Sequence, residues 1–238
     1  MKQTIRFAFF GMITLLLSSC GASNPVEKMQ RELDDYPEYS IILEDMKMEG
    51  TFFKDYFHQY KIIHAEKAGD SLAYFTNQTE WILVDEDFFS NYQRYLGMTI
   101  ASKSAEGDVS DSPQPPGYQY VGDERYGQWR TDNSGNSFWE FYGKYAMLQA
   151  LLGGWNRPIY QDDWRDYRTS RRNNQPYFGK NRQWGTDGTA TKKTNPTFFQ
   201  RRQMREQASK QSFTDKLKQR TRRSNMSKSR SRSGGFGK

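Results

Sequence analysis

Cysteine and histidine are scarce in this sequence. Its 238 residues include one cysteine, Cys20, and two histidines, His58 and His64. A single thiol excludes an internal disulfide and a thiolate metal site, so the fold has to be stabilised by packing. The two histidines lie six residues apart, about 20 Å along an extended strand, which is too far for both to bind one metal ion. The composition therefore predicts a chain without a metal or other cofactor.

Recognisable catalytic motifs are absent as well. There is no phosphate-binding glycine loop and no serine in a nucleophile-elbow pattern. Carboxylates cluster at 85–87 and 162–166, but neither run has the glycine and terminal glutamate of an EF-hand loop. We therefore predict a protein that is not an enzyme. A hydrolase whose paired carboxylates meet only in the folded chain is the open alternative.

Long apolar runs are confined to the N-terminus. Lys2 and Arg6 precede an apolar stretch over 7–17, which is the length of a signal-peptide core and too short to cross a bilayer comfortably. Leu17-Ser18-Ser19-Cys20 follows directly and resembles the lipobox of bacterial lipoproteins: a large aliphatic residue, two small residues and a cysteine. The resemblance covers this signal segment alone and identifies no domain family for the mature chain.

The lipobox resemblance implies a location. Residues 1–19 would be removed as a lipoprotein signal peptide, and the Cys20 thiol would carry a diacylglyceryl group, with palmitate-type acyl chains, that anchors the chain to a membrane. Two acyl chains give lasting attachment. The following Gly21-Ala22 lacks the aspartate associated with inner-membrane retention. We expect a lipid-anchored protein of the cell envelope, on the periplasmic face of the outer membrane where the cell has two membranes.

Charge is distributed unevenly along the chain. Residues 20–112 hold 8 basic and 18 acidic side chains, residues 113–191 hold 10 and 8, and residues 192–238 hold 15 and 2. The overall net charge of +7 therefore hides an acidic N-terminal part and a strongly basic C-terminal tail.

The acidic part, 20–104, reads as a compact α+β domain. A helix over 25–36 has apolar residues at helical spacing, and Pro37 ends it. Aromatic and β-branched residues then favour strands, and Phe53 and Tyr60 are typical of a half-buried sheet surface. We predict a small antiparallel sheet with the N-terminal helix packed on it. The expected strands are 39–49, 51–66 (joined to the first at Gly50), 71–76, 80–84 and a longer last segment, 88–102.

Residues 105–117 are predicted to be a linker, because this stretch is rich in Pro, Gly, Ser and Asp and has too few apolar residues to fold. A second small unit, 118–154, follows, with short strands expected at 118–121 and 128–130 and a turn at 132–136. Ser137-Phe138-Trp139-Glu140 matches a capping box. It predicts an amphipathic helix that runs to Leu152 and ends at Gly153-Gly154.

Residues 155–191 form an arm in which aromatic and arginine residues alternate without a helical or strand period. Flat rings and forked guanidinium groups are what interfaces and stacking surfaces use. Two interpretations stay open: a binding surface, or an arm that wraps the domain with its arginines stacked on rings and paired with aspartates. The candidate interaction residues are Trp155, Arg157, Tyr160, Trp164, Arg165, Tyr167, Arg168, Arg171 and Arg172.

The basic tail spans 192–238. Asn195-Pro196 resembles a helix start, and the composition of 197–222 favours a basic helix with few apolar residues. Residues 223–238 show no periodicity and are predicted to be disordered. Overall, we expect a second unit with one helix and a largely disordered tail beside the α+β domain.

The tail resembles the Arg/Ser and Arg/Gly segments of RNA-binding proteins, but the export signal removes the usual target. Outside the cytoplasm, the partners of matching charge are anionic lipids, wall polymers and acidic proteins. We therefore expect a non-enzymatic interaction or structural role in the envelope, carried by the tail and the arm, with no nucleic acid bound. Nucleic-acid binding remains the alternative if the N-terminal signal is misread.

Overall fold

The computed structural model describes residues 24–50, 52–69, 71–145 and 158–229. The predicted lipid attachment site Cys20 and the signal peptide 1–19 lie outside these residues, as do Trp155 and Arg157 of the arm. Across the described ranges, none of the helices combines the length and the apolar character that a bilayer span requires.

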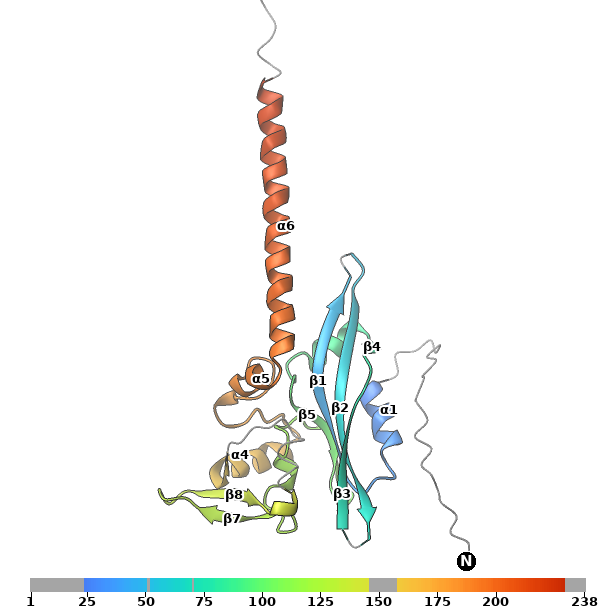
Figure 1. The fold of residues 1–238 in the computed structure, drawn as a ribbon, viewed down its shortest axis with the longest axis vertical. Helices are drawn as coiled ribbons and strands as arrows, with labels where there is room; N and C mark the ends of the chain where they lie inside the picture. The colour runs from blue at the N-terminus through green and yellow to red at the C-terminus, as the bar shows by residue number, and fades with distance from the viewer. Residues whose placement is uncertain (1–23, 51, 70, 146–157, 230–238) are drawn as a thin grey trace, which may run out of the picture.

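The first part of the chain is an antiparallel sheet with helices on one face, so the predicted α+β class is confirmed. Figure 1 shows this sheet with α1 against one side and the second unit toward the other. The strand order is β3-β2-β1-β5-β6, and β4 pairs with β2 beyond the end of β3. The elements are α1 (Pro25–Glu32), β1 (Tyr39–Glu49), β2 (Asp55–Ala68), β3 (Ser71–Gln78), β4 (Ile82–Val84), α2 (Glu86–Tyr92), β5 (Thr99–Lys103) and β6 (Val109–Ser110).

The N-terminal helix forms as predicted but ends four residues earlier, at Glu32. Asn24 is its N-cap, with the side-chain oxygen accepting from the backbone N–H of Val26 at 3.0 Å. Proline at the first helical position costs nothing, because that N–H would have no helical partner. Val26 and Met29 are buried against β1, which fixes the helix on the sheet.

The predicted strands 39–49, 51–66, 71–76 and 80–84 are confirmed in outline, as is the pairing of the first two, although β2 begins only at Asp55. The predicted pairing of 71–76 with 80–84 is wrong, because β3 and β4 each pair with β2. A bulge at Glu44 shifts the β1–β2 register, because Leu43 faces Tyr60 while Asp45 faces Gln59. The bulge moves the next inward position from an odd to an even residue, so Met46 joins the same cluster as Leu43.

The predicted last strand, 88–102, is wrong in its first half. Residues Glu86–Tyr92 are helix α2, and only Thr99–Lys103 is a strand. Asp85 caps the helix by accepting from the backbone N–H of Phe88 at 2.6 Å. Three rings at helical spacing, Phe88, Phe89 and Tyr92, then pack against the core, so an aromatic run that suits a strand equally well becomes helical.

Both faces of the sheet are covered. On one face, α1, α2 and the start of the C-terminal helix enclose a core that includes Ile41 and Ile100. On the other, Ile42 and Ile63 pack with tyrosines of the second unit. The residues that alternate along β1 and β2 therefore serve two separate cores.

The stretch predicted as an unfolded linker is instead part of the sheet. Residues 109–110 form β6 on the edge of β5, and Gln114 exchanges two backbone hydrogen bonds with Thr99, both 2.9 Å. Gln114 is only 2% exposed. Backbone pairing with an open strand edge supplies the stability that the composition lacks. The strand predicted at 118–121 is wrong too, since Tyr118–Tyr120 is a turn of 3-10 helix.

The second unit is built on a hairpin. Strands β7 (Gly127–Thr131) and β8 (Ser137–Phe141) flank the predicted turn, and β9 (Ile159–Tyr160) completes a three-stranded sheet. In the turn, the Asp132 carboxylate accepts from the backbone N–H groups of Ser134 and Asn136 at 2.9 and 2.8 Å.

The helix predicted from the capping box at Ser137 is wrong over the described residues, where Ser137–Phe141 is a strand. Glu140 pairs with Arg130 across the hairpin at 2.8 Å instead of reaching back to the cap. The turn at 132–136 places Ser137 opposite Thr131, so this segment pairs as a strand. Residues 146–152 of the predicted helix lie outside the described residues.

The arm predicted to be irregular contains regular structure, namely α4 (Gln161–Arg172), a short 3-10 turn (Lys180–Arg182) and α5 (Thr189–Thr194). The next helix, α6 (Pro196–Ser229), begins at the predicted proline. It extends seven residues into the tail predicted to be disordered, and 230–238 lie outside the described residues.

Candidate functional site

Helix α4 carries most of the candidate interaction residues, although the arm that contains it showed no helical period. Its charges are ordered along the axis: Asp162 and Asp163 stand in the first turn and Arg171 and Arg172 in the last. This order complements the helix dipole, with acids at the N-terminus and bases at the C-terminus. This helix was not predicted from the sequence, because the arm lacks hydrophobic periodicity; the acid-to-base gradient is the signal that could have indicated it.

Asp163 fixes the helix to the rest of the molecule. Its carboxylate is 5% exposed and accepts hydrogen bonds from the hydroxyls of Tyr118, at 2.6 Å, and of Tyr177. Burial, together with the adjacent carboxylate, raises the pKa of both tyrosines well above the ordinary value. Both hydroxyls therefore stay protonated and keep donating. The aspartate joins three segments that are distant in sequence.

Trp164 forms the wall beside this anchor. Its indole N–H donates to the carbonyl of Val121 at 2.8 Å, and its ring packs against Trp129 with centroids 5.3 Å apart. A β-carbon on Gly122 would lie 2.2 Å from the Trp164 ring, and this glycine has φ +86°. Only glycine therefore fits there. The Arg168 guanidinium lies 4.8 Å from the ring centroid on the solvent side.

An open pocket of about 400 Å³ lies between α4 and the segment that crosses from the first sheet. Five of the nine candidate interaction residues line it, and of these Tyr167 is buried while Arg168 and Arg172 are exposed. The lining residues are Asp108, Tyr118, Gln119, Val121, Trp164, Tyr167, Arg168, Arg171 and Arg172.

Two described candidates do not reach the pocket. Tyr160 is the residue before α4 and belongs to β9, and Arg165 bonds to Gln161 at 3.2 Å on an exposed part of the helix. Conversely, Tyr118 and Asp108 line the pocket but were not predicted, since they come from the segment around the supposed linker. No local pattern marks them, because only the folded chain brings that segment to α4.

The chemistry of the pocket follows from its lining. Three guanidinium groups face one carboxylate, so the lining is net cationic, and guanidinium forks bind carboxylate or phosphate groups through paired hydrogen bonds. Aromatic faces lie beside them. The arrangement suits an anion with a flat or apolar part.

Helix α6 is the second candidate element. Its first turns are docked: Phe198 and Phe199 pack on the core, and Asn195 donates to the carbonyl of Glu44 at 2.6 Å. Arg201 pairs with Asp45 beside the same bulge. The register shift in β1 thus creates the place where the helix attaches.

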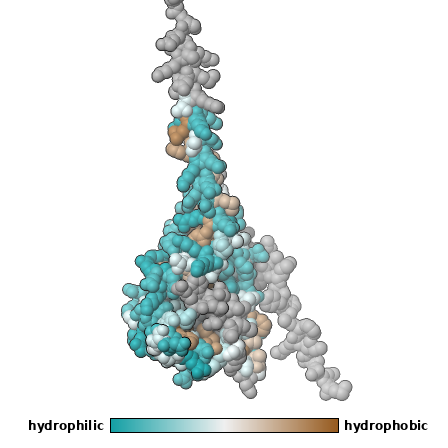
Figure 2. Space-filling view, turned by 60° about the vertical axis from the view of Figure 1, so that its left-hand side comes forward, coloured by the Kyte–Doolittle hydropathy of each residue, from teal (hydrophilic) through white to brown (hydrophobic). Residues whose placement is uncertain are grey.

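Beyond Arg205, the described side chains of α6 are exposed through position 221. The 34-residue helix is about 50 Å long and rises away from the body (Figure 1). It contains ten basic and two acidic residues. Figure 2 shows a mainly hydrophilic shaft with isolated hydrophobic spots, and its exposed apolar residues include Met204, Phe213 and Leu217. A helix without an apolar face gains little from packing on its own protein.

The histidines and the buried carboxylate Glu38 belong to the cores. Burial lowers the pKa of His58 to about 4, and its Nδ1 lies 3.0 Å from the Tyr60 hydroxyl. His64 is 3% exposed. Both histidines are therefore buried in the folded chain. No group of three or more histidine, cysteine or acidic side chains suited to a metal occurs in the part of the chain that the structure describes.

Four of the six carboxylates that the sequence places in clusters have side-chain or backbone partners in the fold. Asp85 caps α2, and Glu86 accepts from the Tyr56 hydroxyl at 2.6 Å. Asp162 pairs with Lys180, and Asp163 with the two tyrosines described above. These contacts give each of the four carboxylates a part in holding the structure together.

Comparison with known proteins finds no matching family model, no matching curated protein and no matching solved structure. The pocket on α4 and the exposed part of α6 are therefore the features from which a function can be inferred.

Proposed function

We propose that this chain is a lipid-anchored, non-enzymatic envelope protein that binds an anionic envelope component through α6, with the arginine-lined pocket on α4 as a second contact. The main observation that supports this proposal is the charge and exposure of helix α6. A helix with ten basic and two acidic residues leaves the body after two docked turns and exposes its described side chains from there onward. Such a surface is adapted to a partner of opposite charge.

The pocket supports the same class of ligand. Arg168, Arg171 and Arg172 are brought together with Tyr118 and Trp164 by an anchor that is buried and fully hydrogen bonded at Asp163. Guanidinium groups held on a hydrogen-bonded base are suited to recognising phosphate or carboxylate.

The anchor at Cys20 remains a proposal from the lipobox resemblance. It predicts a protein held at one membrane, with α6 available to anionic lipid, a wall polymer or an acidic protein within reach of that surface. Labelling cells with a fatty-acid analogue tests it: the wild-type chain should be labelled and Cys20→Ala should not. Unlabelled full-length protein in the cytosol would instead favour the nucleic-acid alternative.

Binding is tested by co-sedimentation of the mature chain with envelope fragments at low and high salt. The test variant replaces Lys210, Lys216, Lys218 and Arg220 with Gln, and Gln207→Ala with Gln211→Ala is the matched control on the same helix. At about 1 kcal/mol for each cation near an anionic surface, the four changes should weaken binding by up to about a thousandfold at low salt. Unchanged binding in the neutralised variant, with helicity intact by circular dichroism, refutes the role of α6.

The role of the pocket is tested with a second set of variants. Arg168→Gln with Arg172→Gln removes two of its cations, whereas Arg165→Gln removes an arginine of the same helix that points elsewhere. Loss of envelope binding in the first variant and not in the second supports the pocket. Equal effects in both would show that general charge alone is responsible.

A further inference from the structure

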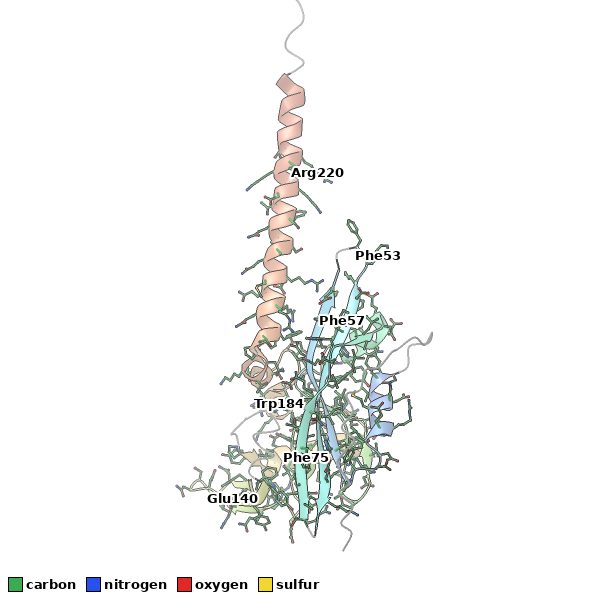
Figure 3. All side chains as sticks on the ribbon, turned by 45° about the vertical axis from the view of Figure 1, so that its right-hand side comes forward. Phe53, Phe57, Phe75, Glu140, Trp184 and Arg220 are labelled. Carbon is green, nitrogen blue, oxygen red and sulfur yellow. The ribbon has the colours of Figure 1, made fainter. Side chains whose placement is uncertain are left out.

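The tip of the β1–β2 hairpin exposes two adjacent phenylalanine side chains. Phe52 is 95% exposed and Phe53 is 92% exposed, the highest values among the large hydrophobic residues that the structure describes. The sequence favoured a strand here with Phe53 on its half-buried surface, but β2 starts only at Asp55. Figure 3 shows Phe53 at the extremity of the hairpin, clear of the body.

The hairpin below these rings is held in place. Strand pairing continues to Glu49 opposite Asp55, immediately below the tip. From α6, the Arg205 guanidinium donates to the carbonyl of Met48 and, at 3.5 Å, to that of Gly50. The phenylalanines therefore stand on a supported projection, and no core residue lies beside them for the rings to cover.

The small size and projecting shape of the tip favour one kind of binding partner. A stable protein interface buries about 800 Å² on each partner, far more than two side chains provide. A bilayer needs no matching surface, because aromatic rings settle at the boundary between head groups and acyl chains. Exposed Lys54 follows the rings in sequence, and the basic root of α6 rises on the same side of the molecule as the tip (Figure 1).

We propose that the β1–β2 tip inserts Phe52 and Phe53 into the surface of a lipid bilayer. Lys54 and the basic root of α6 favour an anionic leaflet, against the opposing charges of Glu49 and Asp55 at the base of the tip, whereas the rings supply an apolar contact that salt does not screen. This inference goes beyond the anion binding proposed for α6 and the α4 pocket, and it does not depend on lipid at Cys20.

The test uses the mature chain with Cys20→Ala, which removes both the lipid and the only thiol. Its binding to phosphatidylcholine vesicles, with and without phosphatidylglycerol, is compared with that of Phe52→Ser plus Phe53→Ser. Loss of the two rings should weaken partitioning into both kinds of vesicle by about tenfold or more. The matched control, Leu83→Ser plus Val109→Ser, removes two other exposed apolar residues and should leave binding near the wild-type value.

A second readout locates the contact. Phe52→Cys in the thiol-free chain, labelled with an environment-sensitive fluorophore, should shift to the blue when vesicles are added, and the same label at Leu83→Cys should not. Equal binding by the tip variant and the parent, equal loss in the control, or an unshifted label would overturn the proposal. Concentration-dependent dimerisation abolished by the tip variant would also overturn it, since the occupant would then be a second copy.

The salt dependence separates this inference from the proposed function. Binding through α6 should fall steeply at high salt and disappear in the glutamine variant, while the contribution of the rings should survive both. Failure of either contribution alone therefore identifies which proposal is wrong.

Discussion

Glu38 joins the two units of the molecule through one buried oxygen. Its Oε1 accepts from the hydroxyls of Tyr74 on β3 and Tyr126 of the second unit, both at 2.9 Å, and the residue is 1% exposed. Its other oxygen, Oε2, is buried without a hydrogen-bond partner among the described residues. Removing this acceptor should therefore be costly, whereas removing only its charge should not.

Glu38→Leu leaves two buried hydroxyls without a partner. At about 1–3 kcal/mol for each, the free energy of unfolding should fall by roughly 2–6 kcal/mol. Glu38→Gln keeps an oxygen that both tyrosines can reach, so its loss should stay under about 1.5 kcal/mol. Urea unfolding of the mature chain with Cys20→Ala, followed by circular dichroism, measures both values. A Glu38→Leu variant as stable as the parent, or a Gln variant as damaged as the Leu variant, would refute the reasoning.

The same residue predicts a pH dependence with a defined sign. Burial raises the pKa of Glu38 above 4.5, although the two tyrosine hydroxyls oppose the shift. An acid whose pKa is higher in the folded state is stabilising when protonated, so its contribution is full below pH 4.5 and declines as pH rises through the folded pKa. The stability of the parent relative to Glu38→Gln should therefore decrease over that window. An increase would contradict the buried, partly paired carboxylate.

Three further predictions concern the second unit and the first core. Asp163→Ala should lower the free energy of unfolding by about 2–6 kcal/mol, because it leaves the Tyr118 and Tyr177 hydroxyls without an acceptor. Asp162→Ala breaks only an exposed ion pair and should cost under about 1 kcal/mol, so equal losses in urea unfolding would count against the role of Asp163. Gly122→Ala should cost about 1–3 kcal/mol and alter the near-ultraviolet circular dichroism of the tryptophans, since its β-carbon would overlap the Trp164 ring at positive φ; an unchanged spectrum and stability would disprove that contact. Burial lowers the pKa of His58 to about 4, so its stabilising contribution is present above pH 6.5. The free energy of unfolding should fall by roughly 3 kcal/mol as the pH falls from 6.5 toward 4, and His58→Phe should remove that dependence.

Sequence reasoning succeeded where local signals and burial agreed. Asn24-Pro25 starts a helix and Asn195-Pro196 precedes another, because proline suits the first turn of a helix. The β1–β2 pair follows from its β-branched and aromatic residues and from Gly50, whose φ is +84°. In these places, nothing distant in the chain competes with the local preference.

It failed where a distant segment decided the outcome. Gln114 is ordered because it pairs with Thr99, and Ser137 is in a strand because the hairpin turn pairs it with Thr131. Neither the composition of the linker nor the spacing of the capping box indicates that Thr99 or Thr131 is the partner. The same limit applies to the pocket: five arm residues were predicted, but the wall around Tyr118 comes from a segment more than forty residues earlier.

The structure also shows where the basic tail can be truncated without damage to the folded part. A boundary at residue 192 falls within α5, and removal of 192–238 would delete Phe198 and Phe199, which pack on the main core. Deletion of 206–238 keeps those contacts and removes only the projecting part of α6. A binding defect in this shorter truncation can then be attributed to the helix and not to a damaged core.

The proposed function requires that α6, on a protein anchored at Cys20, contacts an anionic envelope component. Photo-crosslinking in intact cells from a reactive residue placed at Phe213, which is 63% exposed on α6, tests it most directly. We expect crosslinks to anionic lipid, wall polymer or an acidic envelope protein, and we expect them to be lost in Cys20→Ala and in the four-glutamine variant. The same products from a probe at Ser134, on the exposed β7–β8 turn, or products unaffected by both variants, would contradict it.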